Sequence, residues 1–281
     1  MNFNLRSIPF IALIIFLYYD LKASPVEPRP IAVIHFEQID HLIYIPITIN
    51  GSTPQRFILD SGASVWVIDP SQVSELGLKT QGNGIIHGAG SGSVDVTYAD
   101  SISFGLAGIK NIVPKTTIID ISNAVPGQKI GGLIGYDFFE RYVVEIDYHT
   151  NTIRLFDPKD FIYKGKGTIV PITIKKKQIY IRAKIKVVGQ EAIENEYLVD
   201  SGSADEINDE LISKVAKTTA DGGVGIGKGF KVALGNIETF TIGNITLKNI
   251  PGVSGGQKIG AGLLHNYTVI FDYTHKQMIL E

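Results

Sequence analysis

Two aspartates open the same three-residue motif at two places in the chain. Asp60 follows the apolar residues 57–59 and leads into a Ser-Gly turn, and Asp200 follows residues 197–199 in the same way. This order predicts a buried strand that delivers a carboxylate to a tight turn. Two carboxylates held close together cannot both ionise, so one keeps a proton and acts as an acid while the other acts as a base. Such a pair can activate a water molecule for attack on a carbonyl carbon.

The two motifs belong to a longer internal repeat. Residues 43–45 precede the first motif as residues 179–181 precede the second, and residues 134–148 align without a gap with residues 259–273. A single Asp-Ser-Gly triplet is most often an ordinary turn, so the repeat carries the functional argument. A pseudo-twofold axis between the two units would bring the two carboxylates face to face.

The elements around the motifs are mostly short strands. Asn50 and Gly51 predict a hairpin turn that returns the chain toward Asp60. Residues 69–77 predict a short helix, because an aspartate cap is followed by proline and the segment closes on glycine. The glycine-rich residues 81–93 fit either a hairpin tip or a flap that closes over a ligand. Strands outnumber helices, which predicts an all-β fold with one short helix in each half.

The start of the chain is typical of a secretory signal peptide. An arginine, an apolar run and then small residues occupy residues 1–23. We therefore expect export to the periplasm or the extracellular space, whereas an uncleaved segment would tether the protein to the membrane. The predicted divisions are a signal peptide at 1–23, a first lobe at 30–156, a linker at 157–167 and a second lobe at 168–281.

Composition excludes several kinds of chemistry. The chain has no cysteine, so disulfides, thiolate metal sites and a cysteine nucleophile are absent. The formal net charge of −2 gives no indication of nucleic acid binding, and the six histidines lack a metal-binding pattern. Residues 222–229 lack the Ser or Thr that a phosphate loop needs. Residues 252–256 match a nucleophile elbow, but the flanks are not a strand and a long helix. We expect no cofactor and no metal.

The repeat resembles the pepsin and retropepsin aspartic proteases, and most closely the exported bacterial retropepsin-like proteases with two lobes in one chain. The family motif Asp-Thr/Ser-Gly matches residues 60–62 and 200–202. A second family landmark, an apolar pair and a glycine that cross behind the catalytic turn, matches residues 133–135 well. Residues 258–260 match it less well, because Lys258 stands at the first apolar place. The resemblance covers about residues 30 to 281.

The resemblance implies two homologous β-barrel lobes related by a pseudo-twofold axis, and an endopeptidase whose water lies between two catalytic aspartates. It implies a monomer that binds an extended peptide as an added strand. The site residues that it implies are the catalytic Asp60 and Asp200, the serines Ser61 and Ser201 that tie the two turns together, the close-packed Gly62 and Gly202, the crossing-loop glycines Gly135 and Gly260, and the candidate flap residues Gly88, Ala89 and Gly90.

The second copy departs from the first beside its motif. Asp205 and Glu206 replace Val65 and Trp66, which adds acids close to Asp200. These acids favour an alternative function, a non-catalytic peptide-binding protein that keeps the fold. The retained pair of motifs favours the enzyme, since a binder has no need to bury two like charges.

The residue after the glycine of the motif also differs, being Ala63 in the first copy and Ser203 in the second. A serine hydroxyl at this place can donate a hydrogen bond to Asp200, and such a bond favours the charged form of a carboxylate. We therefore expect the shared proton to reside on Asp60.

Overall fold

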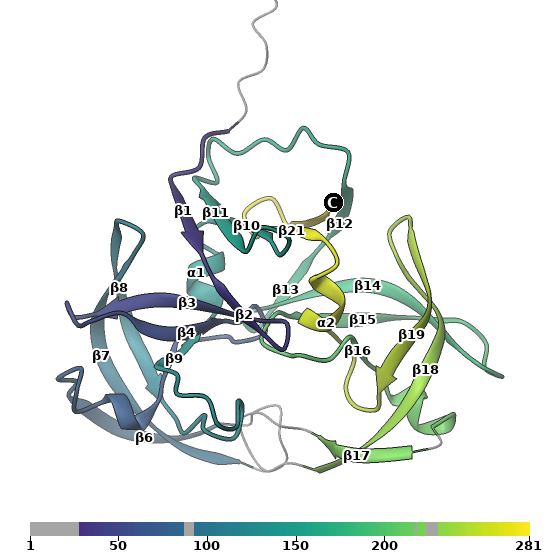
Figure 1. The fold of residues 1–281 in the computed structure, drawn as a ribbon, viewed down its shortest axis with the longest axis horizontal. Helices are drawn as coiled ribbons and strands as arrows, with labels where there is room; N and C mark the ends of the chain where they lie inside the picture. The colour runs from purple at the N-terminus through teal and green to yellow at the C-terminus, as the bar shows by residue number, and fades with distance from the viewer. Residues whose placement is uncertain (1–27, 87–92, 217, 223–229) are drawn as a thin grey trace, which may run out of the picture.

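The structure, a computed structural model, describes residues 28–86, 93–216, 218–222 and 230–281 (Figure 1). The predicted signal peptide lies outside the described residues, as do the candidate flap residues Gly88, Ala89 and Gly90. Within the described ranges, no helix is long and apolar enough to cross a membrane. The predicted all-β fold with two barrel-like lobes is confirmed.

The N-terminal lobe is a β-sheet that closes on itself. Its strand order is β2-β3-β4-β9-β5-β8-β7-β6, and an additional pairing of β3 with β7 closes six of these strands into a barrel. The elements of this lobe are β2 (Glu37–Ile39), β3 (Leu42–Ile49), β4 (Gln55–Leu59), β5 (Val67–Ile68), the 3-10 helix η1 (Pro70–Gln72), β6 (Thr80–Ile86), β7 (Val94–Leu106), β8 (Ile109–Ile118), β9 (Gly132–Ile134) and α1 (Tyr136–Phe139).

Local sequence explains how this lobe turns. Asn50 and Gly51 both have positive φ, at 50° and 80°, and they form the predicted hairpin turn between β3 and β4. Asp69 caps the next helix by accepting a hydrogen bond from the Ser71 amide at 2.9 Å. This helix is only the three-residue 3-10 helix η1, shorter than the predicted helix. The α-helix of the lobe is instead α1, which directly follows β9.

The C-terminal lobe repeats this architecture. Its strand order is β13-β14-β15-β20-β16-β19-β18-β17, and the pairing of β14 with β18 closes the second barrel. The elements of this lobe are β13 (Thr173–Lys175), β14 (Gln178–Val187), β15 (Ile193–Asp200), β16 (Ile207–Asn208), the 3-10 helix η2 (Glu210–Lys214), β17 (Thr218–Gly222), β18 (Phe230–Ile242), β19 (Ile245–Val253), β20 (Lys258–Gly260) and α2 (Ala261–Leu264).

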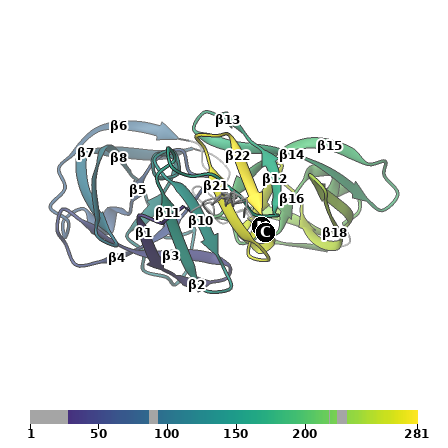
Figure 2. The same ribbon diagram turned by 90° about the horizontal axis from the view of Figure 1, so that it is seen from above.

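A third sheet joins the two lobes and lies between them when the molecule is seen from above (Figure 2). Its order is β1-β11-β10-β21-β22-β12, and its two central strands are antiparallel, with Val144 opposite Phe271. Both halves of the chain therefore contribute strands to one sheet. The strands are β1 (Ala32–His35), β10 (Val143–Asp147), β11 (Thr152–Phe156), β12 (Thr168–Pro171), β21 (Thr268–Asp272) and β22 (Gln277–Leu280).

Two apolar clusters are important for the site. The main core runs through both lobes and the joining sheet. A smaller one, called here the N-lobe wall cluster, packs against the inner strands of the first lobe. It extends from side chains of the β6–β7 hairpin to the first residue of α2 in the second lobe. Its buried members are Leu42, Tyr44, Ile58, Val67, Val96, Ile119, Ile121, Val125, Ile130, Leu133 and Ala261.

Candidate active site

Parallel strand pairs deliver the two aspartates to the interface between the lobes. In the first lobe β4 pairs in parallel with β9 and ends immediately before Asp60. In the second lobe β15 pairs in parallel with β20, with Asp200 opposite Gly260. The crossing strand must come close behind each turn. A Cβ on Gly135 would lie 2.4 Å from the Ala63 carbonyl oxygen, and one on Gly260 would lie 2.1 Å from the Asp205 carbonyl oxygen.

The two serines of the motifs brace the turns against each other. The backbone N–H of each serine donates to the hydroxyl of the other, and both distances are 3.0 Å. The Ser61 hydroxyl then donates to the Val199 carbonyl, and the Ser201 hydroxyl donates to the Leu59 carbonyl, each at 2.8 Å. Both serines are buried, so water does not compete for these four bonds. The brace fixes the separation of the two motifs symmetrically.

The glycines of the motifs allow the aspartates to approach. A Cβ on Gly62 would lie 2.7 Å from Cγ of Asp200, and a Cβ on Gly202 would lie 2.4 Å from Cγ of Asp60. Any larger residue would push the opposite carboxylate away. The structure therefore brings together, around one centre, all six residues of the two predicted motifs.

The two carboxyl groups lie close together but have different surroundings. Asp60 accepts the backbone N–H groups of Gly62 and Ala63 at 2.8 and 2.9 Å. Its pKa is raised well above the usual range, first by burial, then by the charge of Asp200 and by the side-chain hydrogen bond between the two. The two backbone N–H groups lower this pKa, but by less. A raised pKa means that Asp60 takes up a proton more readily than an ordinary carboxyl group.

Asp200 has a different set of partners. It accepts one backbone N–H, from Gly202 at 3.1 Å. The amine Nζ of Lys258 lies 3.7 Å from its Oδ2. The expected bond from the Ser203 hydroxyl to Asp200 is not found in the part of the chain that the structure describes. The Ser203 amide donates instead to the Asp200 carbonyl at 3.2 Å, as the Ala63 amide does to the Asp60 carbonyl at 3.3 Å.

The extra acids of the second lobe have structural partners. The Asp205 carboxylate accepts a hydrogen bond from the Asn208 side chain at 2.9 Å. The backbone carbonyls of Asp205 and Glu206 accept from Gly262 and Gly260 at 3.1 and 3.0 Å, and so help to hold β20 and α2 in place. Among the described residues, neither acidic side chain is hydrogen bonded to the two aspartates.

Sequence reasoning missed two polar side chains at the centre. The Gln178 amide donates to the Gly62 carbonyl at 2.6 Å and so links β14 of one lobe to the Asp-Ser-Gly turn of the other. Lys258 was noted only as a break in the apolar pattern of the crossing loop. That break was the available signal, together with the polar Gln178 at the place of Leu42 in the first copy.

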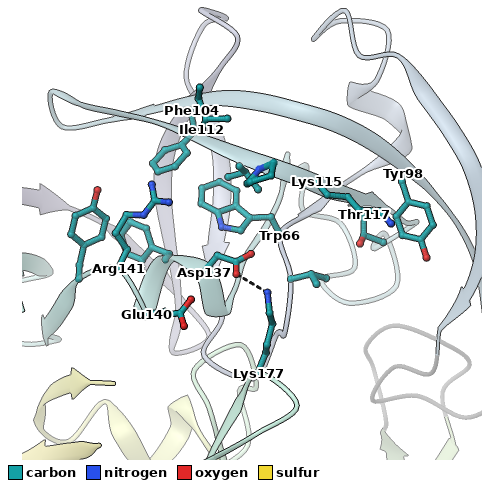
Figure 3. Close-up of a pocket in the computed structure, with 15 residues that line it drawn as sticks. Trp66, Tyr98, Phe104, Ile112, Lys115, Thr117, Asp137, Glu140, Arg141 and Lys177 are labelled. Atoms are coloured by element: carbon teal, nitrogen blue, oxygen red, sulfur yellow. Dashed lines mark hydrogen bonds and ion pairs between the residues drawn. The ribbon is translucent and has the colours of Figure 1, made fainter. Parts of the chain in front are cut away.

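A separate pocket of about 520 Å³ lies beside the first lobe (Figure 3). Trp66 forms part of its wall, and the ion pair of Asp137 and Lys177, at 2.9 Å, lies across it from one lobe to the other. Neither Asp60 nor Asp200 lines this pocket. Within the described residues, no group of three or more histidine, aspartate or glutamate side chains is placed to hold a metal ion.

Residues 45–138 match a family model described as aspartyl protease. The match includes the first motif and the first crossing loop. Over this range the N-terminal lobe is similar to aspartyl proteases. The second lobe of this aspartyl protease fold repeats the same strand order and the same turn, as a two-lobe pseudo-dimer requires. A comparison with curated proteins finds no match.

Proposed function

We propose that this protein is an aspartic endopeptidase that hydrolyses peptide bonds with a water molecule activated between Asp60 and Asp200. The observation that carries the proposal is the approach of the two carboxyl groups at the centre of a buried and symmetric serine brace. Burying two negative charges this close together is unfavourable. A proton shared by the two carboxyl groups removes one of these charges and is also the proton that the reaction needs. Each lobe supplies one aspartate, so a monomer contains the complete pair.

The reaction divides the acid and base roles between the two carboxyl groups. Asp200, as the ionised partner, takes a proton from the water while the water oxygen attacks the peptide carbonyl carbon. Asp60 gives its proton to the carbonyl oxygen, which produces a tetrahedral diol. Asp200 then gives its proton to the leaving nitrogen as the C–N bond breaks, and Asp60 recovers a proton from the diol. No covalent intermediate forms, and the pair returns to its starting state.

The substrate is an extended peptide that lies between the lobes and adds a strand beside the β6–β7 hairpin. We also propose that residues 1–23 direct the protein out of the cytoplasm and that it acts on peptides or proteins in the periplasm or the extracellular space.

The assignment of Asp60 as the acid and Asp200 as the base rests on the raised pKa of Asp60.

A peptide-library digest over about pH 3 to pH 8 tests the proposal. We expect cleavage by the wild type that pepstatin inhibits, and a loss of at least about 100-fold in kcat for Asp60→Asn and for Asp200→Asn. Asp160→Asn, in the exposed connection between the lobes, is the matched control and should keep full activity. Near-normal turnover by either of the first two variants would refute the assignment of the pair.

The alternative, a non-catalytic peptide-binding protein, is favoured by the acidic residues Asp205 and Glu206 beside the second motif. The same variants separate the two functions. If the protein is a binder, the wild type and both variants, Asp60→Asn and Asp200→Asn, should bind peptides equally well and leave them intact. If it is an enzyme, the wild type should cleave peptides, whereas the two variants should bind them without cleavage.

A further inference from the structure

Lys258 places a positive charge beside only one of the two aspartates. It opens β20, where it pairs with Leu198 in the parallel ladder that delivers Asp200. Its Nζ lies 3.7 Å from Oδ2 of Asp200, and the two side chains are 19% and 14% exposed. The residue at the same place in the first lobe is Leu133, which is buried in the N-lobe wall cluster. The pseudo-twofold symmetry of the centre is therefore broken by one charge.

We propose that Lys258 is a positioning residue that holds Asp200 in its charged form, leaves the shared proton on Asp60, and thereby sets the pH range of activity. This inference rests on the proposed function. Asp60 is held by two backbone N–H groups, whereas Asp200 is held by one, so the lysine supplies the additional interaction that Asp200 lacks. An opposite charge within a few ångströms favours the ionised form of a carboxylate.

The other charged and titratable groups near the centre do not duplicate this interaction. Asp205 is hydrogen bonded to Asn208, and Lys177 from the β13–β14 turn is paired with Asp137 of α1. Tyr273, in the turn between β21 and β22, has its pKa raised well above the usual range by burial and by the charge of Asp60, so it is neutral when the pair is active. Further out, Glu206 follows the second Asp-Ser-Gly turn. Tyr136 of α1 donates its hydroxyl to the carboxylate of Glu140, the residue after α1, at 3.0 Å. Among the described residues, Lys258 is the one cation that forms an ion pair with either of the two aspartates, and its partner is Asp200.

The effect on activity has a definite sign. The active pair carries one proton and one negative charge, and losing that proton leaves two negative charges. A nearby cation stabilises both ionisation steps, so it moves the acidic and the alkaline limits of the pH profile to lower pH. Since both side chains are largely shielded from solvent, salt screens this interaction only in part.

The test compares pH profiles of kcat/KM for the wild type, Lys258→Leu and Lys258→Arg on one peptide substrate. Lys258→Leu copies the residue of the first lobe and should shift both limits upward by about one pH unit, which is about a tenfold loss on the acidic side. Lys258→Arg keeps the charge and should restore the wild-type limits. Lys186→Leu, which removes a surface lysine paired with Glu238, is the matched control and should shift neither limit. Superimposable profiles for Lys258→Leu and the wild type would overturn the inference.

A second measurement does not depend on turnover and so separates this inference from the proposed function. In thermal melts at about pH 7, Lys258→Met should lower Tm by about 2 °C in the wild-type background, because it leaves Asp200 charged without its partner. The same substitution should not lower Tm in an Asp200→Asn background. Equal losses in both backgrounds would mean that the lysine acts through packing, and would overturn the inference. If the wild type cleaved no peptide at any pH, the proposed function would be wrong. The comparison of Tm in the two backgrounds would still show whether Lys258 stabilises the charged form of Asp200.

Discussion

The two lobes have the same Asp-Ser-Gly turn but differ in the side chains that pack behind it. In the N-terminal lobe residues 119–131 connect β8 to β9 and add Ile121, Val125 and Ile130 to the cluster that buries Leu133. In the C-terminal lobe β19 and β20 are joined by residues 254–257 alone. This short connection contributes no apolar side chain, and the equivalent position accommodates the partly exposed Lys258. Both copies of the repeat thus keep the hydrogen-bonded Asp-Ser-Gly turn. The length of the connection before the crossing strand determines whether the residue beside that turn is the apolar Leu133 or the charged Lys258.

The barrel interiors differ in the same manner. Trp66 fills the first barrel, with its ring centroid 4.7 Å from that of Phe104, whereas the partly exposed Glu206 stands at its place in the second. There Tyr197 packs edge-on against Phe240 at 5.0 Å and donates its hydroxyl to Asp209 at 2.6 Å. One lobe is filled by a large apolar side chain, and the other combines an aromatic ring with a buried hydrogen bond.

The largest expected difference between the lobes comes from truncating these equivalent residues. Trp66→Ala removes a side chain that is 1% exposed, and we expect a loss of about 3–5 kcal/mol in the free energy of unfolding. Glu206→Ala should change this free energy by no more than about 0.5 kcal/mol. Urea unfolding of both variants measures the difference. Similar losses would show that the two barrels depend equally on this position.

The serine brace should instead respond equally in both lobes. Ser61→Ala and Ser201→Ala each leave a buried N–H and a buried carbonyl without a partner, so each should cost about 2–3 kcal/mol in stability. Ser203→Ala is the control, and its effect should stay within about 0.5 kcal/mol because its hydroxyl forms no hydrogen bond within the described part of the chain. The measurement is denaturant unfolding at constant pH. A clear inequality between the first two variants would contradict a symmetric brace.

Tyr197→Phe probes the hydrogen bond that is particular to the second barrel. Removing the hydroxyl leaves one oxygen of the buried Asp209 without its shortest partner, so we expect a loss of about 1–2 kcal/mol. Tyr180→Phe, whose hydroxyl makes a longer, 3.3 Å bond, is the matched control and should lose less. Chemical denaturation compares the two variants. An unchanged stability for Tyr197→Phe would show that Tyr197 stabilises the second barrel through packing of its ring alone.

The smallest expected effect concerns the pair itself. The pKa of Asp60 is raised in the folded protein, so this group disfavours folding above that pKa, and the penalty disappears as pH falls toward the unfolded value of about 3.9. Asp60→Asn should therefore raise Tm by about 2 °C or more at neutral pH and leave it unchanged at about pH 3. Asp200→Asn also removes the ion pair with Lys258 and should gain less. Melting curves over this pH range would contradict a close pair if Asp60→Asn lowered Tm at pH 7.

The repeat in the sequence was sufficient to predict the all-β fold and the two lobes, and the first copy indicated the similarity to aspartyl proteases. The meeting of Asp60 with Asp200 followed from the same symmetry. What the sequence did not reveal depends on register between distant strands. The parallel pairing of β15 with β20 brings Lys258 to Asp200, and β14 carries Gln178 across to the other lobe. The hydroxyl of Ser203 was misjudged because a rotamer cannot be predicted from residue type alone.

The central pairing of β10 with β21 makes each half of the chain incomplete. Separated from its partner, the first half would expose the edge of β10, an unsatisfied Ser61 and the single carboxyl group of Asp60. An exposed strand edge is a template for pairing with another chain, and a twofold axis through this edge would place a second copy where β21 lies now. The joining sheet is thus the surface through which one half could be exchanged for another. Because both halves of this sheet belong to one chain, the two aspartates come together at any protein concentration.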